Sequence, residues 1–178
     1  MLLNEKTLGS KMIYQGRILN LRVDDVQLLN GKKSKREIVE HKDAVCILAV
    51  KDEQMYFVRQ FRKAVDDVLL EAPAGLVEAG ESAEAAARRE MREELGFNAE
   101  NLEFLFEAYT SPGFSDEKIS FFYADGLYED PLKADDDEFL EIKSIGIKDC
   151  LDMIFDGKIT DLKTASGIFY LARKFKLW

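Results

Sequence analysis

Residues 75–97 read GLVEAGESAEAAARREMREELGF, and this stretch concentrates acidic side chains around one predicted helix. Its six glutamates are Glu78, Glu81, Glu84, Glu90, Glu93 and Glu94. Two interpretations are open at this point: a solvated surface helix stabilised by ion pairs, or part of a site that holds cations. Charge runs on helices are usually solvated faces, so composition alone favours the surface helix.

The ends of the helix are marked in the sequence. Ser82 suits the N-cap position, Glu84 suits the positive end of the helix dipole, and Gly96 suits the C-terminal cap. The alanines, arginines and glutamates between these ends favour a helix. We therefore predict a helix over residues 82–95.

One face of this helix gathers carboxylates. At about 100° per residue, Glu94 lies about 40° from Glu90, and Glu93 lies about 60° to the other side. Like charges this close destabilise a helix unless a counter-charge or water surrounds them. The counter-charge could come from a bound cation or from the arginines of the same helix, which are Arg88, Arg89 and Arg92.

The segment before the helix favours the cation. Residues 71–81, EAPAGLVEAGE, add carboxylates and hold Pro73, Gly75 and Gly80, which suit tight turns. The small side chains at the start of the helix would let this loop pack closely against it; they are Ala83, Ala86 and Ala87. Hard divalent cations such as Mg²⁺ take carboxylate and backbone carbonyl oxygens as ligands.

The spacing across residues 75–97 resembles the sequence motif of the Nudix hydrolases. The matching positions are Gly75, Glu81, Arg89, Glu90, Glu93, Glu94 and Gly96, with apolar Met91 and Phe97. The resemblance covers most of the chain and implies an α/β (α+β) fold, a Nudix-type α/β/α sandwich with a mixed sheet. It also implies cleavage of a nucleoside diphosphate linked to another group, at the pyrophosphate, with Mg²⁺ or Mn²⁺ as cofactor.

The same resemblance implies roles for these residues. The expected metal ligands are Glu90 and Glu94, assisted by Glu93, and the backbone carbonyl of Ala74. Glu81 and Arg89 are expected to form an ion pair that holds the loop against the helix. Gly75 is expected to support the site in the same structural sense.

Further stretches resemble the ADP-ribose pyrophosphatase branch of the family. VRQFRKAV is followed by EAPAG, where this branch usually has Glu-Leu-Pro-Ala-Gly, so Ala72 departs from the pattern. Arg62 is a candidate phosphate ligand, because a guanidinium suits phosphate oxygens. In SPGFSDE, Pro112 lies where the branch carries a proline, and Glu117 is a further substrate-binding candidate. Arg36, in the N-terminal KREIVEH, is another.

The acidic loop before LEIKSI is where this branch often places a general base. Glu138 fits that role best by its distance from the predicted strand, although Asp135, Asp136 and Asp137 are its neighbours and some relatives use a glutamate of the helix, here Glu93. The aromatic side chain that stacks on the nucleotide base is left open between Tyr14 and Phe114. His41, the single histidine, is expected to be structural.

The rest of the chain reads as strands followed by two helices. Asn30-Gly31 predicts a turn between two strands within residues 18–42, because this dipeptide is a strong hairpin signal. The apolar run 44–50 predicts a buried central strand. Further strands are expected at 55–61, 102–109, 118–125 and 140–147, and helices near 147–156 and 161–175. We expect a β-hairpin layer over residues 1–42 and the hydrolase domain over 43–178.

Composition limits the partners and the location. With 178 residues and 47% hydrophobic side chains, the chain can bury a core, and its net charge of −9 disfavours nucleic acid as a partner. No signal peptide and no run of about 18 apolar residues is evident, so no membrane is expected. Cys46 and Cys150 are expected to be buried thiols in a cytoplasmic protein. In the branch that the chain resembles, N-terminal strands exchange between subunits, which implies a homodimer.

These observations lead to one main functional hypothesis and two alternatives. The chain is expected to hydrolyse ADP-ribose, a nucleoside diphosphate sugar, to AMP and ribose 5-phosphate. The first alternative is a pyrophosphatase for another nucleotide sugar such as GDP-mannose. The second is a ligand-sensing module without activity, which the intact motif disfavours.

Overall fold

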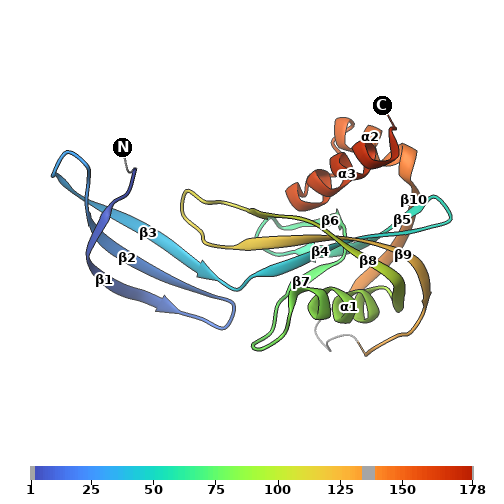
Figure 1. Cartoon of the computed structure of the whole chain (residues 1–178), viewed down its shortest axis with the longest axis horizontal. Coiled ribbons are helices and arrows are strands. Elements are labelled where there is room, and N and C mark those ends of the chain that lie inside the picture. Colours follow the sequence, from blue (N-terminus) through green and yellow to red (C-terminus); the bar gives the residue numbers. More distant parts are fainter. Residues whose placement is uncertain (1–2, 134–138, 178) are drawn as a thin grey trace. The chain divides into compact units, whose positions relative to one another are not determined.

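The computed structural model describes residues 3–133 and 139–177, and the chain divides into two compact units (Figure 1). The first unit runs to Asp43 and includes Ala108–Lys118. The second unit comprises Ala44–Glu107 and the chain from Ile119 onward.

The first unit is a three-stranded antiparallel sheet. Its strands are β1 (Lys6–Gln15), β2 (Leu19–Gln27) and β3 (Lys33–His41), in that order. The turn predicted at Asn30-Gly31 is confirmed, because Gly31 N donates to Leu28 O at 2.9 Å between β2 and β3. β1 was not predicted from the sequence, because all ten of its residues are exposed and it therefore shows no apolar alternation.

The segment 108–118 is bound to the edge of β3. Val39 N donates to Phe114 O at 2.7 Å, and Asp116 N donates to Val39 O at 3.3 Å. His41 N donates to the Asp116 carboxylate at 2.8 Å. These bonds extend the sheet by a short parallel bridge between Val39 and Ser115.

The second unit is built on a mixed sheet. Its main strands lie in the order β10-β5-β4-β9-β8 and are β4 (Ala44–Lys51), β5 (Gln54–Arg62), β8 (Phe97–Tyr109), β9 (Lys118–Glu129) and β10 (Leu140–Gly146). β4 pairs with β9 in parallel and with β5 antiparallel. The short strands β6 (Asp67–Glu71) and β7 (Ala74–Leu76) pair with β5 and β4.

The five main strands were all predicted, with differences in length. β8 begins at Phe97 rather than residue 102, because its first residues include Asn98, Glu100 and Asn101, which read as a loop in the sequence. β9 continues to Glu129. The short β6 and β7 were not predicted, since the segment between them carries turn-forming residues.

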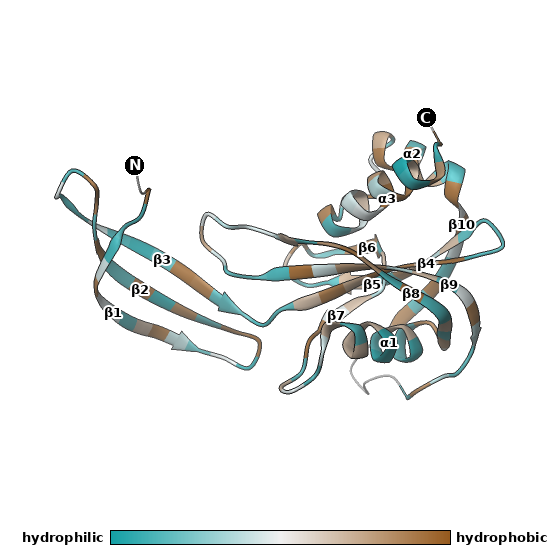
Figure 2. Ribbon diagram, viewed as in Figure 1, coloured by the Kyte–Doolittle hydropathy of each residue, from teal (hydrophilic) through white to brown (hydrophobic). Residues whose placement is uncertain are grey.

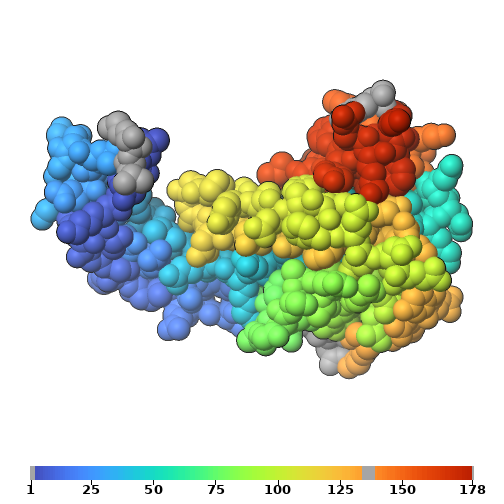
Figure 3. Space-filling model, in the orientation of Figure 1, coloured from blue at the N-terminus to red at the C-terminus, as the bar shows by residue number. Residues whose placement is uncertain are grey.

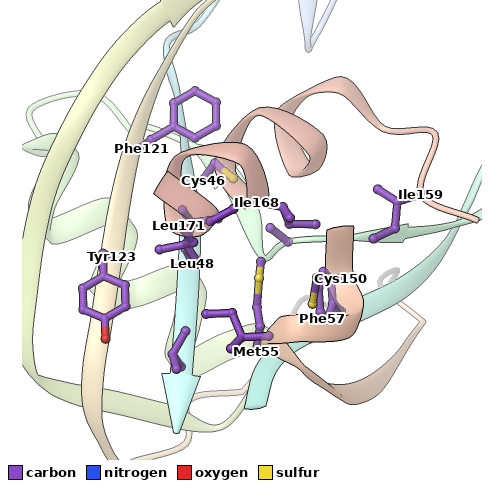
Figure 4. Close-up of a cluster of buried hydrophobic side chains, with 14 of the residues drawn as sticks. Cys46, Leu48, Met55, Phe57, Phe121, Tyr123, Cys150, Ile159, Ile168 and Leu171 are labelled. Carbon is purple, nitrogen blue, oxygen red and sulfur yellow. The ribbon is translucent and has the colours of Figure 1, made fainter. Parts of the chain in front are cut away.

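Alternating side chains of β4 place a helix layer on each face of the sheet. Val45, Ile47 and Ala49 pack with Ala86 and Met91 of α1 (Ala83–Glu94). On the other face, Cys46 and Leu48 pack with α2 (Ile147–Phe155) and α3 (Leu162–Phe175), as Figure 4 shows. This arrangement confirms the α/β/α sandwich with a mixed sheet, and it confirms β4 as a buried central strand.

The outer layers complete the core of this unit. Phe106 of β8 stacks on Tyr170 of α3 with ring centroids 5.3 Å apart, and Figure 3 shows the two segments in contact. Hydrophobic residues concentrate in the strands of the sheet, whereas hydrophilic residues cover much of α1 (Figure 2). Within the described residues, no helix combines the length and the apolar character needed to cross a membrane.

The two cysteines are free and buried, as predicted. Burial raises the pKa of the Cys46 thiol to about 12, and burial also raises the pKa of Cys150 to about 12. Thiols with such pKa values stay protonated and inert at neutral pH. They act as small apolar side chains within the core.

Candidate active site

Helix α1 carries the candidate site, and its ends form as the sequence predicts. The Ser82 hydroxyl accepts from Ala85 N at 3.2 Å, which confirms Ser82 as the N-cap. At the other end, Leu95 N donates to Met91 O at 3.0 Å, and Gly96 follows with a φ of +74°. A left-handed residue here ends the helix and turns the chain into β8.

The loop before α1 is closed by its own acidic residues. Glu81 N donates to Glu78 O at 3.0 Å, and Glu78 N donates to the Glu81 carboxylate at 3.1 Å. The Glu81 side chain is therefore fixed by the turn on which it lies. This places its carboxylate toward the guanidinium of Arg89.

Arg89 connects the loop to the acidic face of α1. Its Nε and Nη2 each donate to Glu81 at 3.1 Å, and Nη2 also donates to Leu76 O at 2.9 Å. Nη1 donates to Glu90 at 2.7 Å and to Glu93 at 2.9 Å. The hydrogen bonds with Glu81 raise the pKa of Arg89 and lower the pKa of Glu81. One guanidinium is thus shared by three carboxylates.

Glu90 and Glu94 are the most buried carboxylates on the acidic face of α1. They are 9% and 6% exposed, whereas Glu93 is more open to solvent. Ala74 N donates to the Glu94 carboxylate at 3.1 Å, so the backbone of β7 lies directly against this side chain. The sequence-predicted residues Ala74, Gly75, Glu81, Arg89, Glu90, Glu93 and Glu94 are therefore brought together around the first strand–helix connection.

Gly75 lets β7 approach α1. A Cβ at this position would lie 2.0 Å from the carboxyl carbon of Glu90, a distance that no side chain can adopt. The absence of a side chain opens the space in which the Glu90 carboxylate lies. Any larger residue must displace either β7 or Glu90.

The chemistry of this donor set fits a hard divalent cation. The carboxylates of Glu90, Glu93 and Glu94 and the peptide of Ala74 offer oxygen ligands of the kind that Mg²⁺ and Mn²⁺ take. Within residues 3–133 and 139–177, no three acidic, histidine or cysteine side chains converge closely enough to hold a metal by themselves. Arg89 lies against two of the carboxylates instead, so phosphate oxygens and water would have to complete the coordination.

Arg62, the predicted phosphate ligand, lies at the end of β5 with its guanidinium on Glu71. Its Nε and Nη2 donate to the two Glu71 oxygens at 2.7 and 2.8 Å. This hydrogen-bonded pair raises the pKa of Arg62. Since the Arg62 side chain is 42% exposed, its outer edge still reaches solvent. Binding of phosphate by Arg62 stays a prediction.

Three other predicted substrate ligands lie in the first unit. Arg36 is paired with Glu5 and also donates to Ser34 at 3.2 Å. Pro112 lies in the segment attached to β3, and Glu117 of that segment accepts from Thr110 Oγ1 at 2.8 Å. Their contacts with substrate stay predictions.

The remaining candidates are the single histidine, the two aromatic residues and the acidic loop. His41 Nδ1 lies 2.8 Å from Lys42 O and 3.4 Å from Glu117, which agrees with a structural part for the single histidine. The two aromatic candidates for stacking on the base, Tyr14 and Phe114, are exposed in the first unit. Glu138 lies outside the described residues, as do Asp135, Asp136 and Asp137, so the choice of general base stays a prediction.

The partners of Glu71 were not predicted from the sequence. Lys163, near the start of α3, forms an ion pair with Glu71 and lies 3.0 Å from Asp161. Thr164 Oγ1 accepts from Ala72 N at 2.8 Å. Glu71 lies within the otherwise apolar EAPAG, which indicates that a buried cation balances its charge. The sequence does not show which residue supplies that cation.

Comparisons with known proteins agree with the fold and the motif. Residues 40–162 match the NUDIX domain, and residues 5–39 match the nucleoside diphosphate sugar hydrolase N-terminal domain. The chain is 43% identical over 175 residues to the ADP-ribose pyrophosphatase of Bacillus subtilis (strain 168), covering 97% of this chain and 95% of that protein. It is 40% identical over 173 residues to the methanol dehydrogenase activator of Bacillus methanolicus, covering 96% and 94%.

A solved structure shows the same fold. A crystal structure of an ADP compounds hydrolase matches with a TM-score of 0.91 at 24% identity, covering 99% of this chain and 96% of that chain. Together with the domain matches, this likeness confirms the resemblance that residues 75–97 indicated. Proteins with this domain generally use divalent metal ions.

Proposed function

The chain belongs to the Nudix hydrolase family, and on this premise we propose that it cleaves the pyrophosphate of ADP-ribose to AMP and ribose 5-phosphate. The observation that carries the proposal is the acidic face of α1. There Glu90 and Glu94 lie against the Ala74–Gly75 backbone beneath a guanidinium shared by several carboxylates. The relatedness to an ADP-ribose pyrophosphatase over nearly the whole chain supports the choice of substrate.

The metal ligands in this proposal are Glu90, Glu94 and the backbone carbonyl of Ala74, assisted by Glu93. A divalent ion, Mg²⁺ or Mn²⁺, would neutralise the pyrophosphate and make a bound water more acidic. The two nearly buried carboxylates favour such an ion, because little water reaches them to offset their charge. Arg89 and Glu81 fix the loop so that the Ala74 backbone stays against Glu94.

The other residues bind the substrate or move protons. Arg62 offers the outer edge of its guanidinium to a phosphate. Arg36, Pro112 and Glu117 are further proposed substrate ligands. Glu138 takes the proton from the attacking water, because a carboxylate outside the metal set can act as a general base. Glu93 is the alternative base.

We also propose that the protein is a homodimer that works in the cytoplasm. The exposed apolar side chains of β1 support the dimer, since a patch of this kind on a thin sheet marks an association surface; they include Leu8, Met12, Ile13 and Tyr14. Size-exclusion chromatography with light scattering tests it. Ile13→Glu should yield a monomer, whereas Phe155→Glu, which replaces an exposed side chain of α2, should not.

A panel of nucleoside diphosphate compounds tests the activity. ADP-ribose, GDP-mannose and other nucleotide sugars are incubated with Mg²⁺ or Mn²⁺ in ¹⁸O-labelled water, and the products are identified by mass spectrometry. We expect AMP and ribose 5-phosphate from ADP-ribose, with one label on a phosphate. Cleavage of GDP-mannose at a higher kcat/KM than ADP-ribose would replace the proposed substrate with the alternative one.

A second candidate function follows from the relative in Bacillus methanolicus. Because that protein is named as an activator of methanol dehydrogenase and aligns over 96% of this chain, this chain could act on a dehydrogenase. The test adds the purified protein, with Mg²⁺, to methanol dehydrogenase and measures alcohol oxidation. An increase that Glu94→Gln abolishes would assign this function to the same site.

A further inference from the structure

We propose that Lys163 is a positioning residue that orients the guanidinium of Arg62 toward the substrate, acting through the buried carboxylate of Glu71. The inference rests on the proposed function, because it concerns the same substrate site. Lys163 lies on α3, on the opposite side of the sheet from α1, and 92 residues after Glu71 in the chain. The sequence motif at residues 75–97 therefore gives no indication that Lys163 contributes to the site.

Glu71 is the centre of this arrangement. Its side chain is 2% exposed, so its charge must be offset by neighbouring cations rather than by water. Arg62 binds both carboxylate oxygens, and the Lys163 ammonium binds one of them. Burial alone would raise the pKa of Glu71, but the hydrogen bonds and charges of these two cations lower it instead.

Lys163 is itself held in place. Its side chain is 13% exposed and lies 3.0 Å from the carboxylate of Asp161, the N-cap of α3. That carboxylate also accepts from Thr164 N at 3.0 Å. The start of α3 therefore holds the ammonium beside Glu71.

Glu71 begins the segment that leads to the candidate metal site. Ala72 N donates to Thr164 Oγ1 at 2.8 Å, and Pro73 O accepts from Ile47 N at 2.8 Å. Ala74, two residues after Ala72, lies against Glu94. The ion pair with Lys163 therefore fixes Glu71, the first residue of this segment. The last residue of the segment, Ala74, lies in the candidate metal site.

The bidentate pair sets the orientation of Arg62. A guanidinium carries five N–H groups, and Glu71 takes one from Nε and one from Nη2, which leaves the outer edge for an anion. When a phosphate binds there, it competes with Glu71 for the same positive charge. Lys163 keeps Glu71 neutralised, so Arg62 can bind phosphate without leaving its partner.

Binding of ADP-ribose in EDTA tests this proposal, because no turnover then occurs. Isothermal titration compares the wild type with Lys163→Met, Lys163→Arg and the control Lys158→Met. Lys158 is an exposed lysine paired with Asp156 in the same part of the chain. We expect Kd to rise about tenfold for Lys163→Met, which is about 1.4 kcal/mol. We expect less than about a threefold change for Lys163→Arg and none for Lys158→Met.

A purely structural role would give a different pattern. It would lower the melting temperature of Lys163→Met, by roughly 10 °C for a broken buried pair, while Kd stayed at the wild-type value. That result would overturn the proposal. Under the proposal, KM of Lys163→Met rises with Mg²⁺ present, and kcat changes by less than about threefold, because the metal ligands are untouched.

A double variant covers the case in which Lys163→Met does not fold. Glu71→Gln/Lys163→Met removes both members of the pair, so neither is left buried without the other. Its Kd should also rise about tenfold, because Arg62 has lost its carboxylate; wild-type affinity there would contradict the proposal. Failure of the proposed function appears separately, as a wild-type protein that does not bind ADP-ribose. The same comparison is then made with whichever compound of the panel does bind.

Discussion

Two charged clusters in the second unit use the same side-chain types but differ in how their formal charges balance. In the cluster at α1, Arg89 is shared by Glu81, Glu90 and Glu93. In the cluster beneath α3, the carboxylates of Glu71 and Asp161 meet the cations of Arg62 and Lys163 in equal number. We call these the acidic cluster and the balanced cluster.

The difference teaches which cluster can take a cation. A balanced cluster of buried charges is complete, and removing one member leaves another uncompensated. An acidic cluster carries negative charge that a divalent cation can neutralise, so removing one carboxylate need not destabilise the fold. Substitutions in the acidic cluster should therefore lower kcat and leave the fold stable. Substitutions in the balanced cluster should lower stability, and through Arg62 they should also weaken substrate binding.

The largest expected effect comes from Glu90→Gln in the acidic cluster or from Glu94→Gln beside it on the same helix. We expect kcat to fall by about a hundredfold or more, since even losing an outer partner of a metal ligand can cost that much. The melting temperature should stay the same or rise, because repulsion among carboxylates decreases. Glu84→Gln is the control, as this exposed residue of α1 pairs with Arg88. Near wild-type kcat in both variants would remove the metal site from this face.

The second effect concerns the proton acceptor. Glu138→Gln should lower kcat by about 10²–10⁴, the range of general acid–base catalysis, while the Mg²⁺ dependence of the rate stays unchanged. Glu141→Gln is the control, because the exposed Glu141 of β10 pairs with Arg59 of β5. If Glu93→Gln instead gives this loss with metal affinity retained, the base belongs to the acidic cluster itself.

A third substitution tests the space on which the acidic cluster depends. Gly75→Ala places a Cβ on the Glu90 carboxylate, so β7 or Glu90 must shift, at a cost of about 1–3 kcal/mol. We expect lower kcat and a lower urea midpoint together. Gly9→Ala in β1, where an added Cβ meets nothing within 4 Å, is the control. Wild-type kinetics in Gly75→Ala would mean that Glu90 need not lie against β7.

The two clusters also differ in how far the sequence predicts them. The acidic cluster was predicted from spacing, because its carboxylates lie on one helix and a short loop, where 3.6-residue periodicity fixes which side chains meet. The balanced cluster joins Glu71 to Lys163 across 92 residues, and no local pattern records such a pairing. The strands β4 and β10 were predicted for the same local reason, through apolar runs and alternation.

The parts of the fold that were not predicted lack a pattern of apolar residues in their own sequence. β1 lacks burial on either face, so its sequence has no alternation to read. β6 and β7 are short strands around Pro73, whose pairing depends on β4 and β5 rather than on their own residues. The attachment of segment 108–118 to β3 rests on backbone hydrogen bonds such as Val39 N to Phe114 O, which side chains do not specify.

The last effect separates the clusters by how the free energy of unfolding depends on pH. The pKa of Glu71 in the folded protein lies below its ordinary value of 4.5, so its ionised form stabilises the fold. This contribution is fully present above the unfolded-state pKa and is lost as the pH falls through the folded-state pKa. Glu71→Gln should cost about 3 kcal/mol near neutral pH, because it removes the buried carboxylate that Arg62 and Lys163 share.

Urea unfolding of the wild type and Glu71→Gln across a pH series measures this difference. The gap between the two midpoints should stay constant above about pH 5 and narrow at lower pH, since the wild-type carboxylate then becomes neutral as well. Glu103→Gln is the control, because the exposed Glu103 pairs with Lys174 on the surface, where such pairs contribute little. A gap that persists unchanged at low pH would mean that Glu71 stabilises the fold through packing rather than charge, and the contrast between the clusters would then rest on the acidic cluster alone.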